Sequence, residues 1–112
     1  MILMGTIPAE IGALDGLTFL SLDHNKICGH LPSEIGRLTS LKVLFLYDNR
    51  LEGPLPAELG ALTALTILYL ENNNFTGEFP STLANLTNLE ELSLEDNNFD
   101  IRPKKKKKKM VE

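Results

Sequence analysis

Leucines and asparagines recur along this chain at a constant spacing of 24 residues. The period is clearest in residues 38–61, which read LTSLKVLFLYDNRLEGPLPAELGA, and a shift of 24 positions in either direction finds the same pattern again. Further copies occupy 14–37, 62–85 and, in shortened form, 86–101, and a half copy occupies 5–13. A fixed period of this length is typical of a solenoid, in which each unit packs only on its neighbours.

Within one repeat, the alternation of residue types predicts a short strand followed by a turn. Leu44 and Leu46 alternate with Phe45 and Tyr47, which gives the two-residue period of a strand with its leucines facing inward. Asn49 follows at the turn, where a buried amide needs hydrogen-bond partners. In a stack of repeats such amides can bond the backbone of the adjacent turn and form a ladder. The asparagines of this predicted ladder are Asn25, Asn49, Asn73 and Asn97.

The second half of each repeat predicts a tight helical turn and a return to the next strand. Gly53 permits unusual backbone angles, and Pro56 suits the first turn of a helix. The segment after Pro56 is too short for a stable α-helix, so one 3-10 or α turn is expected there. Successive strands then run in the same direction, about 4.8 Å apart. The expected fold class is therefore α/β: a solenoid with a parallel concave sheet and short 3-10 or helical turns on the convex side.

The repeat pattern, LxxLxxLxLxxNxLxGxIPxxLGx, resembles the plant-type leucine-rich repeats of receptor kinases, receptor-like proteins and polygalacturonase-inhibiting proteins. The resemblance covers about residues 5–101, and residues 14–37 and 38–61 are identical at ten positions. It implies a second, shorter strand in the stretch Leu51–Pro56. Members of this family usually carry cysteine-bearing caps at both ends, and neither is found here, since Cys28 is the single cysteine. We therefore expect an interior slice or fragment of a longer protein.

Charge divides the chain into two parts. Residues 1–101 hold four basic and fourteen acidic side chains, a net charge of −10, whereas residues 102–112 hold seven basic side chains and one acidic, a net charge of +6. The run Lys104–Lys109 predicts a disordered tail, because like charges repel and add no core. The expected organisation is a leucine-rich repeat domain over 1–101 and a disordered lysine-rich tail over 102–112.

The concave face supplies the candidate binding residues. Phe45 and Tyr69 fall at the same position of adjacent repeats, with Tyr47 one column away, so we expect an exposed aromatic cluster bordered by carboxylates. Large exposed rings are uncommon on a sheet that binds nothing, although variable positions can also be filled without selection. The predicted ligand-binding residues are Phe45, Tyr47, Tyr69, Asp23, Asp48, Glu71 and Glu95.

Other chemistry is sparse in the sequence. Asn74-Phe-Thr76 and Asn85-Leu-Thr87 match the N-glycosylation sequon, although a repeat that places Asn two residues before Thr produces chance matches. His24 and His30 lack a third ligand at a regular spacing, so no metal site is expected. No catalytic motif is present, and we predict neither a cofactor nor an enzyme activity.

These observations favour a protein- or peptide-binding module. The acidic concave face suggests a partner that is basic and carries an apolar anchor. The alternative is a nucleic-acid or anionic-membrane binder that acts through the lysine tail. The family is often extracellular or at the cell surface, but the sequence shows no signal peptide or transmembrane segment, so the compartment stays open.

Overall fold

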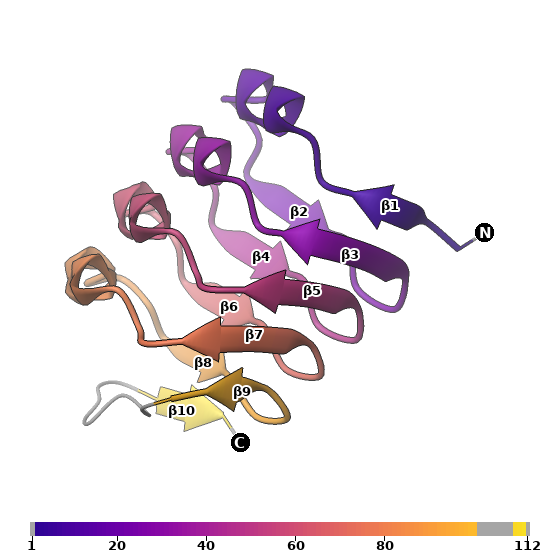
Figure 1. Ribbon diagram of the computed structural model, residues 1–112. Helices are drawn as coiled ribbons and strands as arrows, with labels where there is room; N and C mark the ends of the chain where they lie inside the picture. The colour runs from indigo at the N-terminus through magenta and orange to yellow at the C-terminus, as the bar shows by residue number, and fades with distance from the viewer. Residues whose placement is uncertain (1, 101–108, 112) are drawn as a thin grey trace.

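The computed structural model describes residues 2–100 and the backbone of residues 109–111. Repeats stack side by side, and each contributes a strand to two separate parallel sheets and one 3-10 turn (Figure 1). The expected fold class is confirmed. Four turns with the 3-10 geometry join the sheets on the convex side, namely η1 (Ala9–Ala13), η2 (Ser33–Arg37), η3 (Ala57–Ala61) and η4 (Ser81–Asn85).

The strands that carry the alternating leucines form one sheet, which we call the concave sheet. Its order is β10-β8-β6-β4-β2, and every neighbouring pair is parallel. Leu44 lies opposite Leu68 and Phe45 opposite Tyr69, so residues at equivalent repeat positions form columns across the strands. Its strands are β2 (Phe19–Ser21), β4 (Val43–Phe45), β6 (Ile67–Tyr69), β8 (Glu91–Ser93) and β10 (Lys109–Val111).

The lateral sheet follows the asparagine turns and has the order β1-β3-β5-β7-β9. This is the second short strand that the family resemblance implies, although β5 begins one residue earlier than expected and ends at Gly53. Gly53 adopts a φ of 78°, and a Cβ there would lie within 3 Å of the His30 ring of the preceding repeat. The strands are β1 (Met4–Thr6), β3 (Lys26–His30), β5 (Arg50–Gly53), β7 (Asn74–Gly77) and β9 (Asn98–Phe99).

Each 3-10 turn begins after an extended proline and ends within five residues. Pro56 has φ −72° and ψ 145°, and the backbone N–H of Leu59 donates to its carbonyl at 3.0 Å. The next turn packs so closely that a Cβ on Gly36 would lie 2.6 Å from the carbonyl oxygen of Glu58. Glycine at this position therefore allows adjacent turns to approach, a requirement of packing.

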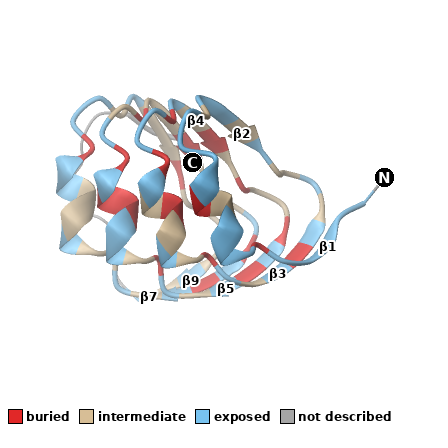
Figure 2. Cartoon of the chain, turned by 90° about the horizontal axis from the view of Figure 1, so that it is seen from above, coloured by how far each residue is buried: buried red, intermediate tan, exposed pale blue. Residues whose placement is uncertain are grey.

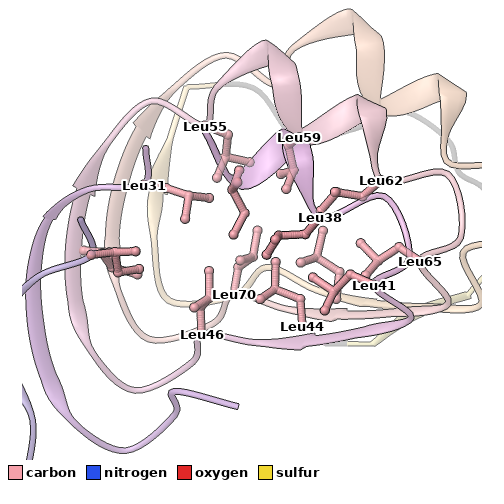
Figure 3. Packing of buried hydrophobic residues seen from close by; sticks show 14 of the residues in the cluster. Leu31, Leu38, Leu41, Leu44, Leu46, Leu55, Leu59, Leu62, Leu65 and Leu70 are labelled. Carbon is pink, nitrogen blue, oxygen red and sulfur yellow. The ribbon is translucent and has the colours of Figure 1, made fainter. Parts of the chain in front are cut away.

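The core lies between the two sheets and the turns. Leucines from successive repeats converge there, with Leu38, Leu41, Leu44 and Leu59 at 0% exposure (Figure 3). Figure 2 shows these buried residues along the interior and mostly exposed residues on the outer side of the turns. The equivalent leucines of the first and last repeats, Leu20 and Leu92, are only partly buried.

The expected tail falls mostly outside the described residues, which end at Asp100 and resume at Lys109. The three tail residues that are described differ from the predicted disorder, because they form β10 and pair in parallel with β8. An edge strand exposes a row of unpaired N–H and C=O groups, which any extended segment can satisfy. The division into a domain over 1–101 and a disordered tail over 102–112 otherwise stays a prediction.

Candidate ligand-binding surface

The strands of the concave sheet direct every second side chain away from the core. Leu44 and Leu46 are fully buried, whereas Phe45 and Tyr47 between and after them lie on the opposite, concave face. Because the register places equivalent positions side by side, three columns run across the sheet. The columns are Phe19, Val43, Ile67 and Glu91; Ser21, Phe45, Tyr69 and Ser93; and Asp23, Tyr47, Glu71 and Glu95.

The rings of Phe45, Tyr47 and Tyr69 pack on one another, so each is half-buried, where substantial exposure was expected. Phe45 stacks on Tyr69 with centroids 5.0 Å apart and planes inclined by 13°. Tyr47 meets both rings edge-on at 5.6 and 5.9 Å. Mutual packing shields apolar area from water and holds each ring in place. The cluster therefore presents a preformed aromatic surface.

The first column is not among the binding residues predicted from the sequence. Phe19, Val43 and Ile67 extend the apolar surface toward the beginnings of the strands, and Phe19 meets Phe45 edge-on at 5.7 Å. Phe19 is 53% exposed. This column could have been predicted, because the two-residue alternation extends from Phe45 back to Val43, and Phe19 is the equivalent residue one repeat earlier. We call Phe19, Val43 and Ile67, together with the rings of Phe45, Tyr47 and Tyr69, the aromatic patch.

Two carboxylates beside the patch are engaged by hydroxyl groups. Asp23 accepts a hydrogen bond from Ser21 and another from Tyr47. Burial opposes the charge of Asp23, but these hydrogen bonds outweigh it and hold its pKa below the usual value. Tyr69 donates to Glu91, and this bond together with burial raises the pKa of Tyr69 to about 12. Burial and then the bond to Asp23 likewise raise the pKa of Tyr47.

Glu71 and Glu95 occupy adjacent positions in the third column. Oxygen Oε1 of Glu71 is shielded from solvent and has no hydrogen-bond partner among the described residues, whereas Glu95 is engaged in a further interaction. Within residues 2–100, the side chain of Glu71 forms no hydrogen bond or ion pair, while its charge acts on both Tyr47 and Tyr69. Glu71 is only partly buried, and its unpartnered oxygen Oε1 is available to accept a hydrogen bond from an incoming cation.

Asp48 has a structural role that its sequence position did not reveal. It has a positive φ of 59°, as do the equivalent residues of the other repeats. Asn, Asp and His tolerate this left-handed conformation better than other side chains. Asp48 also accepts from Asn72 Nδ2 at 2.6 Å and lies 2.7 Å from His24 Nδ1. The non-glycine residues with positive φ in the described part of the chain are His24, Asp48, Asn72 and Asp96.

The asparagines of the predicted ladder follow these left-handed residues directly in the sequence. Asn49 Oδ1 accepts from the backbone N–H of Ile27 at 3.0 Å, and Nδ2 donates to the carbonyls of Leu22 and Leu46 at 2.9 and 3.2 Å. The same bonds recur around Asn73 and Asn97. At the first turn, Asn25 Oδ1 accepts from Leu3. These side chains tie adjacent repeats together and are directed at backbone.

The two sequons lie away from the concave face. Asn74 begins β7 of the lateral sheet and Asn85 ends η4, and both are exposed. A glycan at either residue is a prediction that the geometry permits.

Cys28 is exposed on β3 as a free thiol. Among residues 2–100, no group of three His, Cys, Asp or Glu side chains is arranged to hold a metal ion. Within that same range no helix is long and apolar enough to cross a membrane.

The described fold matches solved ectodomains of plant receptor kinases. The ectodomain of the receptor kinase GASSHO1/SCHENGEN3 from Arabidopsis thaliana, solved in complex with CASPARIAN STRIP INTEGRITY FACTOR 2, is 40% identical with a TM-score of 0.86. The plant peptide hormone receptor RGFR1, in complex with RGF2, is 35% identical in sequence with a TM-score of 0.83. The ectodomain of the receptor kinase SOBIR1 from Arabidopsis thaliana is 36% identical with a TM-score of 0.81. Each match covers 88% of this chain.

The chain is much shorter than these proteins, for it spans 12%, 16% and 57% of their respective lengths. Comparison with curated protein sequences gives no match. A family profile described as a leucine-rich repeat region matches residues 5–112. The chain therefore belongs to the leucine-rich repeat family, in the plant-type form that the repeat pattern indicates.

Proposed function

We propose that this chain is a protein- or peptide-binding module whose ligand lies on the concave sheet, within a longer receptor-like or inhibitor-type protein. The aromatic patch carries this proposal, because it joins rigid rings of adjacent repeats into one accessible apolar surface. Aromatic side chains of this kind dominate the energy of protein interfaces. Two structural relatives are the peptide hormone receptor RGFR1, solved with RGF2, and the receptor kinase HAESA, solved with the peptide hormone IDA, which supports the same class of partner.

The charge around the patch suggests the character of the partner. Acidic side chains border the rings on two sides, and they include Asp23, Glu71, Glu91 and Glu95. Opposite charges on a ligand would speed association and favour the correct partner over others. We therefore expect a basic ligand with an apolar anchor.

A displayed library of peptides that combine basic and apolar residues tests the proposal. Selection is made on the intact chain and counter-selection on the double variant Phe45→Ser, Tyr69→Ser. Serine already occupies the equivalent positions at Ser21 and Ser93, so the variant should fold. Loss of two central rings should weaken a selected peptide by at least about 2 kcal/mol, or roughly 30-fold.

A thermal melt accompanies each binding measurement. A variant that melts close to the parent and binds much more weakly places the ligand on the patch. A variant that folds and binds every selected peptide as tightly as the parent would move the site off the concave sheet.

A further inference from the structure

The concave face changes character along its strands. Strands β2, β4 and β6 begin with an apolar residue, at Phe19, Val43 and Ile67, whereas β8 begins with Glu91. The column at the far end holds Asp23, Tyr47, Glu71 and Glu95. The first and third columns are four residues apart along the chain, for example at Ile67, which begins β6, and at Glu71, two residues past its end. At about 3.3 Å per residue this separation is roughly 13 Å.

Glu71 differs from the other carboxylates around the aromatic patch. Asp23 and Glu91 already accept hydrogen bonds from Tyr47 and Tyr69, whereas the Glu71 side chain accepts none from the described residues. The rings of Tyr47 and Tyr69 are 5.9 Å apart, and the charge of Glu71 acts on both. An uncompensated carboxylate beside two tyrosine rings is suited to a planar cation.

We propose that the concave face recognises an extended peptide by two anchors: a basic side chain, preferably arginine, bound at Glu71 against Tyr47 and Tyr69, and an apolar side chain four residues away on Phe19, Val43 and Ile67. This inference rests on the proposed function and specifies the ligand chemistry of the same face.

Two physical arguments favour arginine at Glu71 and a spacing of four residues between the two anchors. A guanidinium group can bond a carboxylate through two N–H donors while its flat face stacks on a ring, which lysine cannot do. In an extended peptide, residues four apart point to the same side. A peptide lying along β6 would therefore bring one such side chain over Ile67 and the other over Glu71.

Intrinsic fluorescence makes the site directly observable. The chain has two tyrosines and no tryptophan, and Tyr47 and Tyr69 both flank the proposed cation position. Blocked nine-residue peptides of Gly and Ser, with Phe and Arg four residues apart, are titrated while tyrosine emission is recorded. The matched peptides replace Arg by neutral citrulline, replace Arg by Lys, or place Phe and Arg three residues apart.

We expect the peptide with Arg to bind about tenfold more tightly than the one with citrulline, as expected for one charge-assisted hydrogen bond with stacking. The preference should disappear in Glu71→Gln. It should persist in Glu52→Gln, which removes an equal charge from an exposed position of β5 in the lateral sheet. The three-residue spacing and the Lys peptide should both bind more weakly than the parent peptide.

The outcomes separate this inference from the proposed function. Equal affinity for Arg and citrulline peptides, or a preference that survives in Glu71→Gln, overturns the cation site and leaves peptide binding on the patch intact. Absence of a response to every peptide overturns the two-anchor arrangement, while the library selection judges peptide binding independently. If the selection also finds no ligand that depends on Phe45 and Tyr69, the proposed function itself fails.

Discussion

The inner and outer repeats carry the same motif and give it different environments. Asn49 and Asn73 are 8% and 6% exposed, whereas Asn25 and Asn97 make similar hydrogen bonds and are only partly buried. Leucines follow the same trend, since Leu44 is fully buried and Leu20 is not. A repeat position therefore fixes which bonds a residue makes, while its neighbours decide how much those bonds stabilise the protein.

The largest expected effect comes from truncating an inner leucine. Leu44→Ala should destabilise the chain by about 2–5 kcal/mol, because it leaves a cavity in packing that cannot collapse. Leu20→Ala removes the same atoms from a partly exposed site and should cost clearly less. Chemical denaturation of both variants measures the difference. Equal losses would mean that the first repeat is as well packed as the second.

The asparagine turns test the comparison for hydrogen bonds. Asn49→Ala removes the side-chain acceptor of the buried N–H of Ile27, while the carbonyls of Leu22 and Leu46 keep their bonds from Asn25 and Asn73, so we expect a loss of about 1–3 kcal/mol. Asn97→Ala breaks equivalent bonds where water can replace them, and its loss should be smaller. Asn98, one residue beyond the motif and exposed, should be nearly neutral when changed to Ala. Melting shifts of equal size for Asn49 and Asn98 would reject the ladder.

The glycines of the 3-10 turns probe packing between neighbours. Gly36→Ala forces a methyl group against the carbonyl of Glu58, and overpacking of this kind costs about 1–3 kcal/mol. Gly16→Ala meets no atom within 4 Å and should leave the melting temperature nearly unchanged. Ala84 already occupies the equivalent position of η4 and is exposed there. A harmless Gly36→Ala would show that the turns separate easily.

The smallest expected effect concerns a bond between an inner and an outer repeat. Tyr69 donates to Glu91 of β8, and its pKa of about 12 lies above the value near 10 of an unfolded chain. This bond therefore stabilises the fold fully below about pH 10 and ceases to do so as pH rises through 12. Glu91→Ala should lower the phenolate midpoint of Tyr69 in an absorbance titration. An unchanged midpoint would mean that burial, not Glu91, sets it.

Most of the fold could be predicted from the sequence, because each repeat shows the same alternation of leucines and the same spacing of asparagine, glycine and proline. The inward leucines of β4 and β6 and the 3-10 turn after Pro56 follow from alternation, period and proline. The family resemblance supplied the lateral sheet. The site was harder, because a pattern of types does not show which rings touch. Alternation placed Phe45 and Tyr69 correctly, but the apolar column with Phe19 was overlooked and the rings are less exposed than expected.

Asp48 illustrates a different limit. Its charge suggested a binding residue, yet a positive φ already restricts the position to a few residue types. The same restriction explains why His24, Asn72 and Asp96 replace one another at equivalent turns. A positive φ and a role in ligand binding can both favour the same amino acid, and a single sequence does not distinguish the two causes.

The constant register has a kinetic consequence. The strand pairs within residues 2–100 join positions 22 or 24 residues apart, as at Cys28 with Arg50 and at Phe19 with Val43, and the pair of β8 with β10 joins positions 18 apart. No pairing has to wait for distant ends of the chain to meet, so closing each new loop costs about the same entropy. Folding can therefore start at β4 and β6, where the leucines are fully buried, and spread outward one repeat at a time. Amide hydrogens should exchange most slowly in those two strands and progressively faster toward β2 and β8.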